Sequence, residues 1–370
     1  MKQCSYILSL FIILICLSCS KQNNKINLKW NKGHEQDSLE RGITGLKWAL
    51  SYLGSTIASD STLKGISYKD SIITLNIDDL GFSKNSRAVL AKLQYIFKNT
   101  ESYKINNSMD LGRYIALTFG NSQHYFAIVN TPKNLEQFYQ LYTLDSSKGY
   151  IDNSSVSKVD REISFSSISK DHTQGFISIE LDTITKDTLE YETAEIMTNG
   201  QLRFGIYDSD GELKNAGDNK ITKAGKPAKC IWCHEVVVQP MFRKQLNHNG
   251  YLSYTMFNDT LQYFNHKLQG YQDNLWKDKN LLNKRLHTEL ELAYITFMEP
   301  NAQRISEEWK MPLAEVKQKL SHLTTHNYKE FPFLGNLYHR KDIDELGPYN
   351  YLEVPESIRE ESNNEINLLN

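Results

Sequence analysis

The sequence predicts an α+β fold, in which a mixed N-terminal α/β and β-rich region is followed by a mostly helical C-terminal region. Two observations predict it. Apolar residues recur at helical spacing near the N-terminus, as in Leu39, Ile43 and Leu46, and again in the C-terminal half. Between these parts, Ile163–Ile168 and Phe176–Leu181 alternate apolar and polar residues, as half-buried strands do. A chain of 370 residues is long enough for two or three domains.

Residues 34–140 are predicted to form an α/β domain. The first apolar stripe indicates a helix that begins after Asp37 or Ser38 and ends at Gly54. A strand at 72–77 and a second helix, capped near Asn85 and carrying apolar residues up to 97, follow it. Two later runs rich in β-forming residues, 113–119 and 125–129, are expected to pair as a hairpin through 120–123.

The rest of the chain divides into a β-rich region, 141–212, a helical region, 213–345, and an acidic tail, 346–370, expected to be loose. Asp208-Ser209-Asp210-Gly211 predicts a turn, because the later ligand positions of a calcium loop are out of register. Residues 215–229 are expected to form an exposed loop. The predicted elements are strands at 163–168, 176–181 and 202–207 and helices at 251–268, 281–297 and 312–322.

The N-terminus predicts export. Residues 1–18 combine a positive start with a short apolar run, which is typical of a signal peptide. Cys19 follows in a lipobox-like context, so we expect it to carry lipid above a tether at 19–33. The residue after it is Ser20, not Asp, which by resemblance to lipoprotein sorting rules favours the outer membrane, facing the periplasm or the cell surface. An ordinary cleaved signal without lipid is the alternative.

The charge balance excludes one class of partner. Lys and Arg together number 42 and Asp and Glu 44, which gives a net charge of −2. Nothing in this composition predicts binding to nucleic acid or a strongly basic membrane-binding face. The expected contact is therefore with the membrane through the N-terminal lipid, and not with nucleic acid.

The segment Cys230-Ile231-Trp232-Cys233-His234 is the strongest motif of the chain. Cys-x-x-Cys-His is the attachment signature of c-type haem, and this stretch resembles cytochrome c-type haem proteins. The resemblance implies one covalent haem c, with Cys230 and Cys233 as thioether ligands and His234 as proximal iron ligand. Trp232 is expected to shield the porphyrin edge. Cys230 and Cys233 are the two cysteines left once the N-terminal ones are set aside, and haem attachment takes place outside the cytoplasm, so motif and export signal agree.

The sixth iron ligand is less well specified by the sequence. Met311 precedes Pro312, as the methionine of small cytochromes c precedes a proline-containing turn, so we predict it as the distal ligand. A five-coordinate iron stays open as an alternative. Other residues within reach in the sequence are Met241, Met256, Met298, His248, His266 and His287.

Two other sites compete with haem. Cys230 and Cys233 could bind zinc with His322 and His326, but the two pairs are far apart in the sequence and His234 has no part in such a site. They could also act as a dithiol, but such motifs follow a strand, and here a polar loop precedes the motif. The leading functional hypothesis is a lipid-anchored electron carrier of the cell envelope that exchanges electrons with an unidentified redox protein. The alternatives are a surface-binding lipoprotein with a structural Cys-x-x-Cys-His site and a haem enzyme such as a peroxidase.

Overall fold

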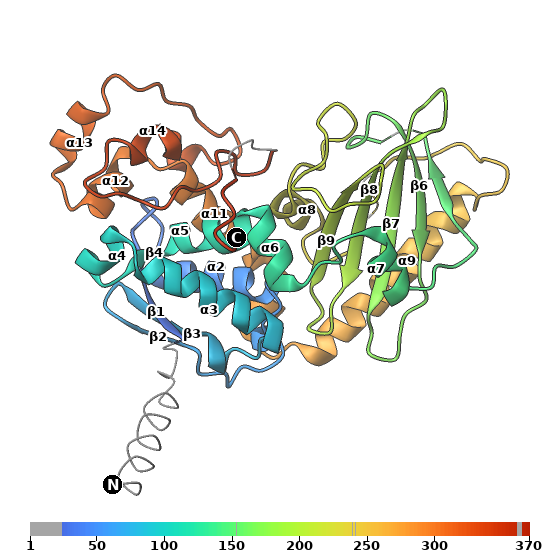
Figure 1. Cartoon of the computed structure of the whole chain (residues 1–370), viewed down its shortest axis with the longest axis horizontal. Coiled ribbons are helices and arrows are strands. Elements are labelled where there is room, and N and C mark those ends of the chain that lie inside the picture. The colour runs from blue at the N-terminus through green and yellow to red at the C-terminus, as the bar shows by residue number, and fades with distance from the viewer. Residues whose placement is uncertain (1–23, 153, 239, 241, 361–364) are drawn as a thin grey trace, which may run out of the picture.

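The computed structural model of the protein describes residues 24–152, 154–238, 240, 242–360 and 365–370. It confirms the α+β class, with two lobes lying side by side (Figure 1). The predicted signal peptide and Cys19 lie outside the described residues. No helix among the described residues is both long enough and apolar enough to cross a membrane.

The first lobe, here called the helical lobe, is built on a four-stranded sheet in the order β2–β3–β1–β4. β1 pairs antiparallel with β3 and parallel with β4, so it lies in the interior of the sheet, where Ile26 and Leu28 are buried. Strand β1 therefore overturns part of the predicted tether at 19–33. The strands are β1 (Lys25–Lys29), β2 (Ile66–Lys69), β3 (Ile72–Asn76) and β4 (Met109–Asp110).

Helices from both halves of the chain complete the helical lobe. The predicted first helix is confirmed as α2 (Leu39–Tyr52), capped by Ser38, and it packs against α11 (Thr288–Met298). From the N-terminal half come η1 (Thr56–Ala58), η2 (Ile77–Asp79), α3 (Lys84–Lys98), α4 (Glu101–Asn106), α5 (Leu111–Ile115), the π-helical turn η3 (Ala116–Gly120) and α6 (Ser122–Val129). From the C-terminal half come α10 (Lys279–Leu282), η4 (Lys284–His287), α12 (Ala302–Trp309), α13 (Leu313–Lys319), η5 (Pro332–Leu334) and α14 (Arg340–Asp344).

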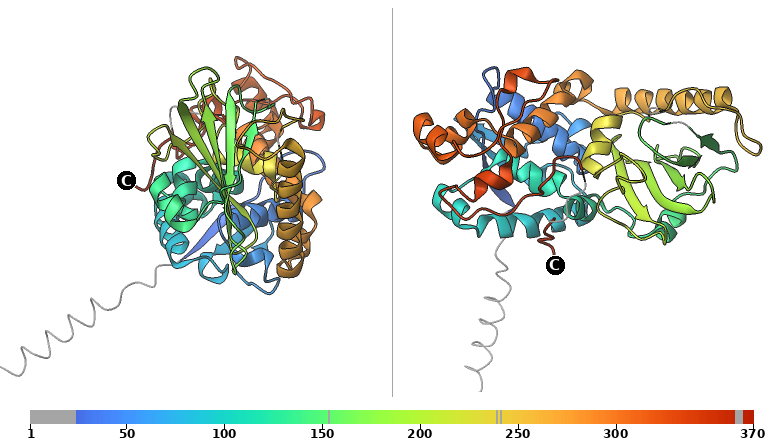
Figure 2. Two further views of the ribbon diagram at one scale, coloured as in Figure 1. Left: turned by 90° about the vertical axis from the view of Figure 1, so that its right-hand side faces the viewer. Right: turned by 90° about the horizontal axis from the view of Figure 1, so that it is seen from above.

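The second lobe, the sheet lobe, is a five-stranded antiparallel meander in the order β5–β6–β7–β8–β9. Helix α9 (Tyr254–Leu275) runs along one face of it (Figure 2), where Phe264 packs on Phe165 and Phe176. Helix α7 (Leu135–Leu141) packs on the opposite face through Phe138. The strands are β5 (Gly149–Ile151), β6 (Asp160–Phe165), β7 (Gln174–Leu181), β8 (Thr188–Ile196) and β9 (Leu202–Asp208).

The hairpin predicted over 113–129 is wrong, because both runs are helical. The Asp110 side chain accepts hydrogen bonds from the backbone N–H groups of Gly112 and Arg113 and so begins α5. Asn121 caps α6 in the same way through His124. Nearly every residue of these helices is buried, which removes the polar face that would have revealed a helical period.

Two segments expected to be exposed or loose are packed instead. In the predicted loop at 215–229, Lys226 is fully buried. In the predicted tail, Val354 and Ile358 are buried, and the Glu365 carboxylate lies 2.6 Å from the Lys226 ammonium. The tail thus returns to the segment that precedes the Cys-x-x-Cys-His motif.

Candidate functional site

The motif forms the end of helix α8 (Pro227–His234), at the junction of the two lobes (Figure 1). Pro227 occupies the first turn, where a missing N–H costs nothing. The helix stops at Glu235, whose φ of 49° turns the chain away. On a helix, residues separated by three and four positions share one face, so Cys230, Cys233 and His234 lie on the same side of α8.

Contacts made by Ile231 and Trp232, on the other sides of α8, fix the orientation of this helix. Ile231 is buried in the core, and the Trp232 ring packs on Tyr294 with ring centroids 5.5 Å apart. The Arg359 guanidinium lies 4.5 Å from the centre of the Trp232 ring. Trp232 therefore packs against α11 and the C-terminal segment, and not on the pocket described next, where it was expected to shield a porphyrin.

Cys230 and His234 line an apolar pocket between α8 and the face of the five-stranded sheet that α9 covers. The pocket encloses about 120 Å³. The His234 ring lies 5.5 Å from that of Phe204 on β9. The other apolar side chains of the lining are Ile163, Phe176, Ile177, Ala194, Ile206, Val238, Pro240, Phe242 and Leu261. Cys233 is not part of this lining.

One end of the pocket is charged. The Arg161 guanidinium pairs with Glu192 at 2.6 Å and with Glu180, which is fully buried. Burial raises the pKa of Glu180 to about 7, although the charge of Arg161 opposes this effect. The charge of Arg161 is thus already balanced by its two neighbours.

The chemistry of His234 suits coordination. Burial lowers the pKa of its ring to about 4, so the imidazole is neutral at neutral pH. Its buried Nδ1 atom has no hydrogen-bond partner among the described residues. A buried polar atom without a partner is costly, and such an atom in a native protein calls for a ligand or another explanation.

Neither rival site gains support from the arrangement. The zinc hypothesis fails, because His326 lies beside Glu299 and His339, and His322 is exposed; neither is grouped with Cys230. The dithiol hypothesis requires stabilised thiolates, yet burial raises the pKa of both Cys230 and Cys233. The two thiols are not joined in a disulfide.

The structure does not place Met311 opposite His234. Met311 packs in a small separate cluster around Ile305 and Trp309. Met241 lies outside the described residues, and none of the other candidates lines the pocket. Among the described lining residues, His234 is the only histidine and no methionine occurs.

One cluster of potential metal ligands is not predicted from the sequence. Glu299, His326 and His339 come together from three separate segments of the helical lobe, whereas the sequence suggests only His326, paired with His322. No local pattern joins these positions. Family models, curated proteins and solved structures were all compared with the chain, and none of them matches it.

Proposed function

We propose that the protein carries one covalent haem c and acts as a redox protein of the cell envelope. Cys230 and Cys233 hold the porphyrin through thioether bonds, and His234 is the proximal ligand. The observation that carries the proposal is the His234 imidazole: neutral, half-buried beside Cys230 in an apolar pocket, and with its buried Nδ1 atom unpartnered among the described residues.

The donors and the walls fit the group. Cys230 and His234 line the pocket, Cys233 lies beside it on the same helix, and Phe176, Phe204 and Leu261 supply apolar walls. The pocket itself, at about 120 Å³, is smaller than the roughly 300–1,000 Å³ of typical ligand sites. Loading of haem therefore requires the pocket to widen.

The residues of the chain have distinct parts in this function. Haem supplies a one-electron iron couple when bound. His234 holds the iron and, through its basicity, tunes its reduction potential. The apolar walls keep the surroundings dry, which also controls the potential. The buried salt bridges of Arg161 fix the charged end of the pocket.

The first experiment tests attachment. Protein matured with the haem-attachment machinery in the periplasm is expected to stay red after denaturing electrophoresis and to gain the mass of one haem. Cys230→Ser/Cys233→Ser should be colourless. His234→Ala should keep a covalent haem with an altered spectrum, whereas His248→Ala, a control outside the pocket, should match the wild type. A colourless wild-type chain refutes the proposal.

A ligand-binding or catalytic haem is the second candidate function. The observation behind it is that His234 supplies the one imidazole among the described lining residues. An open iron gives a high-spin ferric spectrum and binds cyanide rapidly. A low-spin spectrum with an iron–methionine charge-transfer band supports electron transfer instead, and its survival in Met311→Ala would direct the search to other methionines.

The proposed lipid anchor at Cys19 is tested separately. Cys19→Ala should release the protein from membranes, because each buried methylene of a lipid chain contributes ~0.8 kcal/mol to binding. Carbonate-washed membranes that retain the variant would show that another anchor exists.

A further inference from the structure

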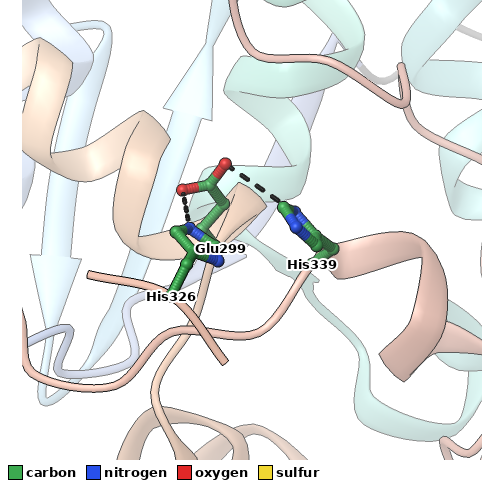
Figure 3. Close-up of side chains that lie close together, drawn as sticks. All are labelled: Glu299, His326 and His339. Atoms are coloured by element: carbon green, nitrogen blue, oxygen red, sulfur yellow. Dashed lines mark hydrogen bonds and ion pairs between the residues drawn. The ribbon is translucent and has the colours of Figure 1, made fainter. Parts of the chain in front are cut away.

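Glu299, His326 and His339 form a second cluster of ligating side chains, distinct from the pocket of His234 (Figure 3). The Nε2 atom of His326 lies 2.7 Å from Oε2 of Glu299. The Nδ1 atom of His339 lies 3.9 Å from Oε1 of the same carboxylate. The two imidazole rings are nearly parallel, with centroids 4.6 Å apart.

The backbone around the cluster holds it in place. His326 and Leu337 exchange two backbone hydrogen bonds, of 3.1 and 3.0 Å. That pairing brings the segment before α14 alongside His326, and His339 follows as the residue that precedes α14. Glu299 ends α11, and the Tyr338 N–H donates to the carbonyl of Pro300 at 3.0 Å. Three segments are thus tied together by main-chain bonds next to each ligand.

The spacing of the donor atoms matches that of metal ligands. Zinc binds imidazole nitrogen and carboxylate oxygen at roughly 2.0–2.2 Å, which in a tetrahedral site separates neighbouring ligand atoms by about 3.3 Å. The two observed separations from Glu299, 2.7 and 3.9 Å, lie on either side of that value. One donor atom from each of the three residues lies within 4.8 Å of the other two. A cation would therefore need only small side-chain movements.

The surroundings suit an accessible site. Side-chain exposure falls from 48% for His339 to 32% for His326 and 13% for Glu299, so one side of the cluster is open to solvent. Tyr328 packs near His326, with ring centroids 5.9 Å apart.

We propose that Glu299, His326 and His339 bind one first-row divalent cation of the zinc class, leaving a coordination position for water. Two imidazoles and one carboxylate are a common ligand set of metal sites that keep an open position. This site is independent of haem attachment, since it shares no residue with α8 or its pocket.

The test titrates Zn²⁺, and Co²⁺ as a spectroscopic probe, into the haem-loaded full chain after chelator treatment. We expect one ion per chain in addition to haem iron, with the absorption of cobalt bound by nitrogen and oxygen. His339→Ala and Glu299→Gln should each weaken binding at least tenfold. His322→Ala, an exposed histidine on the same segment, should bind as the wild type does.

Two comparisons make the result decisive. Far-ultraviolet circular dichroism checks that the variants fold; His339 is the safest position, because it is the most exposed ligand. The Cys230→Ser/Cys233→Ser variant, which cannot attach haem, should still bind one ion. Loss of metal in that variant but not in His339→Ala would overturn the proposal, as would a wild-type chain that binds no ion.

Discussion

Replacing Glu308 by Gln is expected to cost about 3 kcal/mol of folding stability at neutral pH. Glu308 lies on α12 with its carboxylate between two guanidinium groups. Arg304 approaches to 2.5 Å and Arg340 to 2.9 Å, and the three side chains are 6%, 3% and 1% exposed, respectively. The Arg340 Nε also donates to the Phe297 carbonyl, so the group joins α11, α12 and α14.

The magnitude follows from the pKa of Glu308. Burial alone would raise it, but Arg340, Arg304 and Arg113 outweigh burial and bring it from the ordinary 4.5 to about 2. A depression of this size corresponds to about 3 kcal/mol, since one pKa unit is worth ~1.4 kcal/mol. Breaking a buried ion pair by removing one partner costs ~3–5 kcal/mol in other proteins, which agrees.

The lowered pKa of Glu308 also determines how its contribution to folding stability depends on pH. The ionised form of Glu308 is favoured in the folded state, so its contribution is complete above pH 4.5 and is lost as the pH falls toward 2. The difference between wild type and Glu308→Gln should therefore be constant from pH 7 to about 5 and should shrink below that.

Urea unfolding at several pH values measures this difference. Glu315→Gln, an exposed residue on α13, is the matched control and should change stability by less than ~0.5 kcal/mol. A loss below about 1 kcal/mol for Glu308→Gln, or a loss that does not change with pH, would refute the reasoning.

Two further predictions concern packing and the C-terminal segment. Gly45→Ala should destabilise the protein by ~1–3 kcal/mol, because the added Cβ would lie 2.5 Å from a backbone oxygen of α11. Gly270→Ala on α9 should stabilise it by ~0.5–1 kcal/mol, because no atom lies within 4 Å of the added Cβ. Thermal unfolding compares the two, and equal effects would contradict the packing argument. Lys226→Met should lower folding stability by ~3–5 kcal/mol, because the buried Glu365 carboxylate would lose its positively charged partner. Adding Glu365→Gln should restore most of that loss, and a double variant as unstable as the single one would argue against a charge effect.

The sequence predicted those elements that keep one polar face. Helix α2 and strands β6, β7 and β9 show clear periods, and the structure contains them. Helices α5 and α6 are buried nearly all round, so their apolar runs could not be told from strands. Strand β8 was not predicted, because Glu190, Glu192 and Glu195 interrupt its apolar residues. Each of these acids pairs with a basic side chain brought close by the fold.

The candidate site also has one part that the sequence pattern predicts and one part that only the fold brings together. Cys230, Cys233 and His234 lie within five consecutive residues, so their spacing alone carries the haem prediction. The strands that line the pocket beside them are β6, β7, β8 and β9, and no local pattern encodes how they come to lie next to α8. The same holds for Glu299 and His339, which reach His326 only through the pairing of distant segments.

The position of β1 has a consequence for how the protein sits at a membrane. If Cys19 carries lipid, only five residues separate it from Lys25, the first residue of an interior strand of the sheet. An extended chain spans at most ~3.6 Å per residue, so these six steps reach about 20 Å. The helical lobe would then stand directly on the bilayer surface with one end of its sheet facing the headgroups. A partner would then have to approach the pocket of His234 from the side, because the protein could not swing freely on its anchor.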